Sequence, residues 1–314
     1  MRTTWIRIGR WSLLAAVGGV LLTGAARAHA RRRAKEQAQD TGLFAGSPTP
    51  QLVARQFTFT EGPAVDKAGN VYFTDQPNNQ IWKYDLRGQL SVFMDPAGRA
   101  NGMYFDAKGN LIACADEKNQ LWSIAPDKKV TVLVDQPPGH RLNGPNDVWV
   151  APGGGMYFTD PYYQRDYWQH TAPEQPGQYV YYLAPGQHQP TVVETTLKKP
   201  NGIIGTRDGK TLYVADIEGD KTYRYQLGPT GALAGRQLFV EQGSDGMTLD
   251  ERGNVYLTGK GVTVYSPAGE RLAHLDVPEE WTGNICFGGK DRKTLFITAS
   301  KGVYVVPMRV RGGQ

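Results

Sequence analysis

The chain contains only two cysteines, Cys114 and Cys286, among its 314 residues. This count excludes a disulfide-stabilised scaffold and a cysteine-rich zinc module. Both cysteines lie in apolar, strand-like runs, so we expect buried free thiols. A disulfide bond between them is the alternative in an oxidising compartment.

Outside its N-terminus the chain also lacks a surplus of basic residues. The formal net charge is +5, but the first 40 residues hold eight of the 35 Lys and Arg and two of the 30 Asp and Glu. The other residues therefore carry 27 basic and 28 acidic side chains. Nucleic-acid-binding domains need a positive surface, so we expect no nucleic acid as a partner.

Beyond the N-terminus no segment shows a long helical period of hydrophobic residues. Hydrophobic residues make up 40% of the chain and charged residues 21%, as in ordinary globular proteins. The 38 Gly and 20 Pro favour turns, and the 16 Tyr and 7 Trp favour strands. The composition therefore predicts many short strands joined by turns.

The N-terminus has the composition of a secretory signal peptide. Met1–Arg10 is basic, Trp11–Ala26 is mostly apolar, and two small-residue cleavage patterns follow, at 26–28 and 28–30. The apolar run of 16 residues is shorter than the roughly 20 needed to span a membrane, which disfavours an uncleaved anchor. We expect removal of residues 1–30, a flexible segment at 31–48, export to the periplasm and no stable membrane insertion.

One sequence unit recurs six times in the rest of the chain. Each copy holds an alternating apolar strand, a turn that usually contains Gly, and a second apolar strand. The copies start 40, 45, 55, 44 and 38 residues apart, at Glu61, Asn101, Asn146, Asn201, Asp245 and Gly283. Such units predict an all-β, six-bladed β-propeller over residues 49–310, with 51–57 as the strand that closes the ring. Six copies in register disfavour the alternative, a two-sheet sandwich.

Five of the six starting residues carry a side-chain oxygen, and equivalent positions of a propeller lie on one circle around its axis. The position enters a strand, so the preference of hairpin turns for Asn and Asp does not explain it; capping of the strands is the alternative. Converging carboxylate and amide oxygens suit a hard cation such as Ca²⁺. The ring contains no His or Cys, which disfavours a closed zinc site.

Four motifs in this order resemble the senescence marker protein/gluconolactonase/luciferin-regenerating-enzyme family of six-bladed propellers. They are the Glu-Gly-Pro at Glu61 and the segments Pro145–Asp147, Pro200–Gly202 and Asp245–Met247. The resemblance covers residues 55–310. More distantly, the chain resembles diisopropyl fluorophosphatase and the paraoxonases.

The resemblance implies one central divalent cation, first of all Ca²⁺, with Mg²⁺, Mn²⁺ or Zn²⁺ as alternatives. The implied metal ligands are Glu61, Asn146, Asn201 and Asp245. Asn101 and Asp147 are then candidates for substrate binding, Asp147 as the acid beside the Asn146 ligand. The implied activity is metal-dependent hydrolysis of a sugar lactone, and Asp245 is our candidate for general base or nucleophile.

The longest interval between two copies contains an aromatic segment, Asp160–His170, which we expect to determine specificity. Its four aromatic residues could stack on a sugar ring, while Gln164 and Arg165 bond hydroxyl groups; Tyr162 and Trp168 are our substrate-binding candidates, beside Tyr163 and Tyr167. Packing of the segment onto the blades is the alternative. His140 could overhang the site.

Two other functions fit the same sequence. A phosphoryl oxygen could replace a carbonyl oxygen on the cation, as in a phosphotriesterase. A propeller can also bind a ligand without catalysis, because this fold supports many functions. A closed propeller has few exposed sheet edges, so we expect a monomer.

Overall fold

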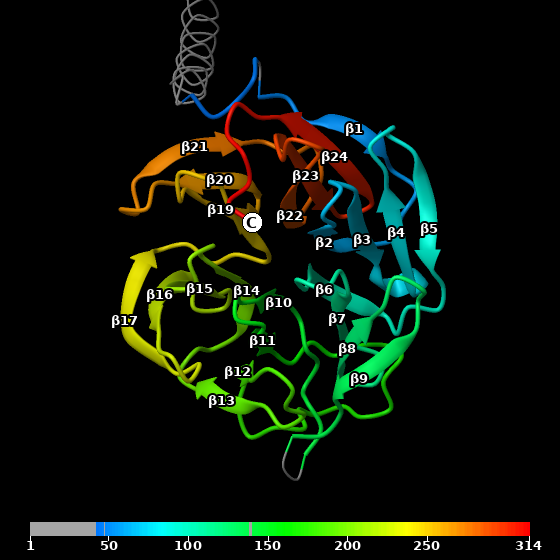
Figure 1. Ribbon diagram of the computed structural model, residues 1–314, viewed down its shortest axis with the longest axis vertical. Helices are drawn as coiled ribbons and strands as arrows, with labels where there is room; N and C mark the ends of the chain where they lie inside the picture. Colours follow the sequence, from blue (N-terminus) through cyan, green and yellow to red (C-terminus); the bar gives the residue numbers. More distant parts are fainter. Residues whose placement is uncertain (1–41, 47, 138–139) are drawn as a thin grey trace, which may run out of the picture. The chain divides into compact units, whose positions relative to one another are not determined.

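The computed structural model describes residues 42–46, 48–137 and 140–314. These residues form six four-stranded antiparallel sheets placed around a central axis (Figure 1). The prediction of a six-bladed propeller is therefore confirmed. The predicted signal peptide lies outside the described residues. Within them, no helix has the length and apolar character to cross a membrane.

We number the sheets as blades 1 to 6. Blade 1 contains β2 (Thr60–Val65), β3 (Val71–Asp75), η1 (Gln76–Asn78), β4 (Gln80–Tyr84) and β5 (Leu90–Met94). Blade 2 contains β6 (Ala100–Phe105), β7 (Leu111–Ala115), β8 (Gln120–Ile124) and β9 (Val130–Val134). Blade 3 contains β10 (Val148–Val150), β11 (Met156–Asp160), β12 (Tyr179–Leu183) and β13 (Thr191–Glu194).

The second half of the ring repeats this pattern. Blade 4 contains β14 (Pro200–Gly205), β15 (Thr211–Asp216), β16 (Lys221–Leu227) and β17 (Leu233–Val240). Blade 5 contains β18 (Met247–Leu249), β19 (Val255–Gly259), β20 (Gly261–Tyr265) and β21 (Arg271–Leu275). Blade 6 contains β22 (Thr282–Gly288), β23 (Thr294–Ala299), β24 (Gly302–Pro307) and β1 (Gln51–Ala54).

The ring closes between distant parts of the chain. Strand β1 pairs antiparallel with β24, so Gln51 lies opposite Val305, and the first strand becomes the outer strand of the last blade. The predicted closing strand is confirmed, with the bounds 51–54 in place of 51–57. Closure of this kind ties the two ends of the fold together with main-chain hydrogen bonds.

The expectation of a flexible segment up to residue 48 is wrong for its described part. Leu43 is only 1% exposed and packs in a cluster with Met308 and Val310. The amide of Arg309 donates to the carbonyl of Leu43 at 2.8 Å, and Phe44 forms an isolated bridge with Met308. The burial of Leu43 and the main-chain hydrogen bonds beside it fix this stretch against the last blade.

The C-terminus runs from blade 6 to the central axis (Figure 1). The amide of Gly312 donates to Arg292 at 2.9 Å, and that of Gly313 donates to Leu249, also at 2.9 Å. A Cβ atom on Gly312 would lie 2.5 Å from the Cβ of Phe287, so only glycine lets the chain pass this close. Gln314 ends at the central channel.

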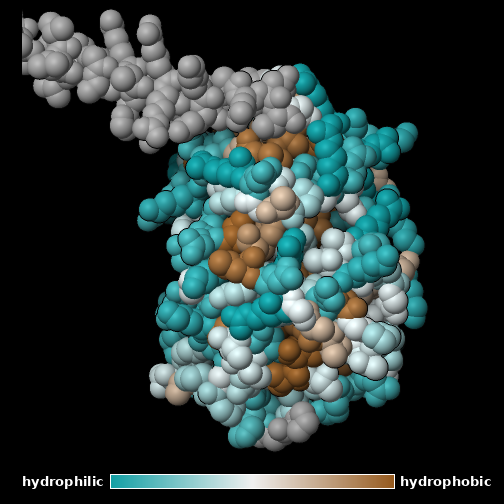
Figure 2. All heavy atoms as spheres, turned by 90° about the vertical axis from the view of Figure 1, so that its left-hand side faces the viewer, coloured by the Kyte–Doolittle hydropathy of each residue, from teal (hydrophilic) through white to brown (hydrophobic). Residues whose placement is uncertain are grey.

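Hydrophobic side chains fill the spaces between adjacent sheets. Both cysteines are buried and free, as expected. Exposed large apolar residues occur on several outer strands, and Figure 2 shows a mainly hydrophilic side with separate hydrophobic areas. Isolated apolar residues of this kind are normal on a protein surface. The monomeric state stays a prediction.

Candidate functional site

The innermost strand of each blade leaves its regular ladder at the residue that starts the sequence unit. In blade 1 the register of β2 with β3 shifts between Glu61 and Ala64, and in blade 4 that of β14 with β15 shifts between Pro200 and Ile203. Blades 2 and 6 show the same irregularity, whereas in blades 3 and 5 the inner strand begins after this residue. A bulge re-aims a side chain, so these four irregular entries can turn the starting residues away from the regular ladder.

Buried threonines on the second strands hold three of these irregular turns. The hydroxyl of Thr159 accepts the amide of Asp147 at 3.1 Å, and that of Thr258 accepts the amide of Gly246 at 2.8 Å. Thr298 does the same for Asn284 at 3.0 Å. These threonines were not among the predicted site residues. The available signal was a Thr near the end of four of the six second strands, at Thr74, Thr159, Thr258 and Thr298.

Gly283 is the one starting residue without a side chain, and its neighbour explains why. A Cβ atom at Gly283 would lie 2.5 Å from Oε1 of Glu61. The space that a side chain would need in blade 6 is therefore occupied by the carboxylate from blade 1. Gly283 makes room for a ring member.

The ring of oxygens is largely removed from solvent. Glu61, Asn101, Asn146 and Asn201 are each at most 7% exposed, and Asp245 is half-buried. Oε2 of Glu61 accepts the amide of Gly62 at 2.9 Å. The side-chain oxygen of Asn201 is buried and has no hydrogen-bond partner among the described residues. Such an orphaned acceptor is uncommon and requires an explanation.

The ring also concentrates negative charge. Burial raises the pKa of Glu61 well above its ordinary value, and the nearby charges of Asp245 and Asp147 raise it further. Burial raises the pKa of Asp245 to about 6, although hydrogen bonds from Trp281 and Asn201 oppose the rise. The indole nitrogen of Trp281 donates to Oδ2 of Asp245 at 2.6 Å. The charge of Asp245 disfavours ionisation of Glu61, and a cation beside the two carboxylates would relieve this repulsion.

These residues fit a hard divalent cation. The donors are carboxylate and amide oxygens from blades 1, 3, 4 and 5, and one of them, Oδ1 of Asn201, is a buried acceptor without a donor. No cluster of three or more His, Cys, Asp or Glu side chains suited to a metal occurs in the described part of the chain. The proposed set contains only two such residues, Glu61 and Asp245, because its other members are amides.

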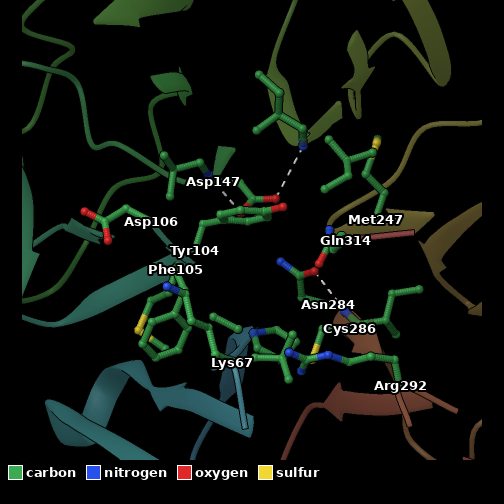
Figure 3. Close-up of a pocket in the computed structure, with 18 residues that line it drawn as sticks. Lys67, Tyr104, Phe105, Asp106, Asp147, Met247, Asn284, Cys286, Arg292 and Gln314 are labelled. Carbon is green, nitrogen blue, oxygen red and sulfur yellow. Dashed lines mark hydrogen bonds between the residues drawn. The ribbon is translucent and has the colours of Figure 1, made fainter. Parts of the chain in front are cut away.

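A second layer of side-chain oxygens comes from Asp147 and Asn284, each of which follows a starting residue by one position. Figure 3 shows these two side chains. Oδ1 of Asp147 accepts the amide of Val148 at 3.0 Å, and Oδ2 accepts that of Ile203 at 3.3 Å. Oδ1 of Asn284 accepts the amide of Ile285 at 2.8 Å. Both side chains line a cavity of about 140 Å³ in the channel. Burial raises the pKa of Asp147 to about 7.

This position gives Asp147 a structural task. Both carboxylate oxygens bind main-chain amides, one in its own blade and one in blade 4. Asp147 therefore connects the segment that contains Asn146 to the segment that contains Asn201. Its assignment to substrate binding gains no support from these contacts. The substrate role of Asn101, whose carbonyl accepts the hydroxyl of Thr74 at 3.2 Å, stays a prediction.

The aromatic segment of blade 3 reaches the ring through residues other than the two assigned to substrate. The amide nitrogen of Asn201 donates to the hydroxyl of Tyr163 at 2.9 Å, and the charge of Arg165 lowers the pKa of Asp245. Tyr162 bonds Gln164 inside the segment. Trp168 stacks on His170 with ring centroids 4.6 Å apart.

The contacts of the segment support the packing interpretation for Tyr162 and Trp168, and the stacking of its rings on a substrate stays a prediction. Tyr162 and Trp168 make the packing contacts of the segment, whereas Tyr163 and Arg165 face the ring. The sequence named all four residues, but residue type alone could not say which aromatic ring points inward. His140 is exposed, and no described contact joins it to the ring.

Comparison with known proteins places the site in context. Residues 59–301 match the family described as SMP-30/Gluconolactonase/LRE-like region. The gluconolactonase of Zymomonas mobilis is 29% identical over 293 residues, which cover 83% of this chain and 82% of the relative. A pentonolactonase of Haloferax volcanii is 36% identical over 242 residues, 74% of this chain and 78% of the relative.

A solved structure of another gluconolactonase is similar to this chain in fold. The structure of a gluconolactonase from Xanthomonas campestris superimposes with a TM-score of 0.76 at 28% identity and covers 82% of this chain and 88% of that chain. Residues 59–301, which match the family, contain every proposed ring residue.

Proposed function

Because the chain belongs to the SMP-30/gluconolactonase/LRE-like family, we propose that it is an enzyme that hydrolyses a sugar lactone with the help of one divalent cation. Relatives named gluconolactonase and pentonolactonase support the substrate class. The observation that carries the cation is the buried Oδ1 of Asn201, which has no hydrogen-bond partner among the described residues, beside two carboxylates whose pKa values burial raises.

We assign the cation to Glu61, Asn146, Asn201 and Asp245, with Ca²⁺ as the first choice. When bound there, a hard cation would polarise the lactone carbonyl and stabilise the negative charge that develops on its oxygen. The all-oxygen donor set with two carboxylates supports Ca²⁺ over Zn²⁺.

Asp245 is the residue we propose as general base. Without a cation, burial raises the pKa of Asp245 to about 6, so this carboxylate is more basic than an exposed aspartate. Trp281 donates to Oδ2 and fixes the orientation of the carboxylate. Water then attacks the carbonyl carbon while Asp245 takes its proton. The ring C–O bond breaks, and the departing oxygen receives that proton, which leaves a hydroxy acid.

A panel of substrates with and without chelator tests this function. We expect hydrolysis of aldonolactones, loss of activity in chelator, and recovery on addition of CaCl₂. An organophosphate triester is included, because faster turnover of the triester would replace the lactonase proposal with a phosphotriesterase. Cation binding without turnover of any lactone or ester would favour a ligand-binding propeller.

We also propose that the protein is exported. The basic and apolar segments before residue 30, followed by two small-residue patterns, support this proposal. The mass of the protein from a periplasmic extract should place its first residue at His29 or Arg31. An intact Met1 in the membrane fraction would contradict it.

A further inference from the structure

Four of the six second strands end at or just before an aspartate, and three of these aspartates do the same work. They accept main-chain amides from the segment that enters the inner strand of their own blade. Asp75 binds Thr58 and Phe59 at 3.1 and 3.2 Å. Asp160 binds the amides of residues 143 and 144, each at 2.9 Å, and Asp216 binds those of 198 and 199 at 3.0 and 2.9 Å.

Asp116 stands at the equivalent place in blade 2 and has different partners. Its Oδ2 accepts Nε of Arg165 at 2.7 Å, the hydroxyl of Tyr167 at 2.8 Å and the side-chain amide of Gln76 at 3.0 Å. Its main-chain carbonyl accepts the indole nitrogen of Trp168 at 2.8 Å. Three of these four donors belong to the aromatic segment of blade 3.

Another residue has taken over the usual task in blade 2. Oδ1 of Asn79 accepts the amides of Ala97 and Arg99 at 3.0 and 2.6 Å, in the segment that enters β6. The carboxylate of Asp116 is therefore not needed to hold its own blade. It is 1% exposed, and a charged group buried to this degree is stable only with paired donors.

We propose that Asp116 is a positioning residue that holds the segment 162–170 over the metal ring and so sets substrate specificity. The inference rests on the proposed lactonase function of the ring below. The segment spans the site between two attachments, Asp116 in blade 2 and Asn201 in blade 4. Arg165 and Tyr163 are the two links, and their side chains are neighbours, with the guanidinium 5.5 Å from the ring centroid.

In this arrangement the position of segment 162–170 depends on the charge of Asp116. The segment belongs to blade 3, so it must reach back over blade 2 to meet Asp116. Asp116→Asn keeps one oxygen acceptor for Arg165 and Tyr167 but removes the negative charge that strengthens these hydrogen bonds, and it takes no oxygen from the proposed metal site. The segment should then open, while the cation stays bound.

The test compares Asp116→Asn with the matched control Asp75→Asn. Trypsin cleavage after Arg165, identified by fragment mass, reports opening of the segment without any assay of activity. We expect cleavage about tenfold faster in Asp116→Asn, on the scale of one lost charge-assisted hydrogen bond, and no change in Asp75→Asn. Calcium affinity measured by calorimetry should be unchanged in Asp116→Asn.

Kinetics with a pentonolactone and a hexonolactone complete the test. In Asp116→Asn we expect KM to rise about tenfold and the preference between the two lactones to shrink. Asp75→Asn should lower the melting temperature and leave KM and the preference unchanged. Tyr167→Phe removes a single hydroxyl, and we expect smaller changes in the same direction if Asp116→Asn does not fold.

The outcomes separate this proposal from the lactonase function. Cleavage and KM equal to wild type in a folded Asp116→Asn or Tyr167→Phe protein would overturn the role of Asp116. If the wild type hydrolyses no lactone, the proposed function fails, and faster cleavage after Arg165 would still support the attachment alone.

Discussion

Two layers of buried side-chain oxygens surround the central channel one residue apart, and they differ in what satisfies them. In the upper layer, Oδ1 of Asn201 has no hydrogen-bond partner in the described part of the chain, and Glu61 accepts one main-chain amide. In the lower layer, Asp147 accepts two main-chain amides and Asn284 accepts one. The same residue types therefore divide into oxygens that are free to bind a cation and oxygens already used by the backbone.

The two layers show that residues next to each other in sequence can have different tasks. Asn146 and Asp147 are adjacent in sequence, and residue type alone would make the carboxylate the better ligand for a cation. Both residues precede β10, and Asp147 lines the channel cavity with its two oxygens bound to main-chain amides, which leaves Asn146 as the proposed ligand. Backbone geometry, more than charge, decides which side chain can bind.

The largest effect should come from the upper layer. Glu61→Gln keeps the size of the side chain but removes one of two ring charges. We expect calcium affinity to fall by at least about 100-fold, the upper end of what loss of a supporting residue alone causes. Calorimetric titration with CaCl₂ measures this change. Wild-type affinity in this variant would remove Glu61 from the proposed site.

Asp147→Asn makes the same chemical change in the lower layer, so it is the matched control. An amide offers only one acceptor to the two amides of Val148 and Ile203, and one buried donor loses its partner. That costs about 1–3 kcal/mol, partly offset because burial already disfavours the charged form of Asp147. We expect a melting temperature lower by a few degrees and little change in KM.

The outcome of this control can also reverse the comparison. A large rise in KM with an unchanged melting temperature would restore Asp147 as a substrate contact. Loss of calcium binding as complete as in Glu61→Gln would place Asp147 in the ring itself.

Much of the fold follows from the sequence because the repeat is periodic. Six copies of the unit predict the six blades, and the apolar stretch before the first copy predicts the closing strand. The repeat also shows that Gly283 is the one starting residue without a side chain. Only the structure shows that the Glu61 carboxylate occupies the space of that side chain. The docked Leu43 was missed, because one apolar residue in a polar stretch gives no periodic signal.

The aromatic segment of blade 3 was less predictable. Its composition indicated a role near the site, but Asp116 lies in blade 2 and looks identical in sequence to the aspartates of its neighbours. Its different task depends on Asn79, which binds the backbone in its place. Such an exchange between residues far apart in sequence has no local pattern.

The last prediction concerns the pH dependence of stability with and without a cation. The folded protein holds a proton on Asp245 up to a pKa of about 6, whereas the unfolded chain loses it near the ordinary value of 3.8. The pKa of Glu61 is raised in the same sense. A raised carboxyl pKa stabilises the folded state most below the unfolded value, and this contribution is lost as pH rises through the folded value.

A bound cation replaces the proton, so its stabilising effect should grow with pH over the same window. We expect the difference in melting temperature between samples with CaCl₂ and with chelator to be small near pH 4 and to increase by several degrees towards pH 7. Other raised groups, such as Asp160, contribute equally to both samples and cancel in the difference. Glu61→Gln should flatten the difference, whereas Asp147→Asn should keep most of it. A difference that is constant with pH would mean that the cation does not compete with protons at the ring.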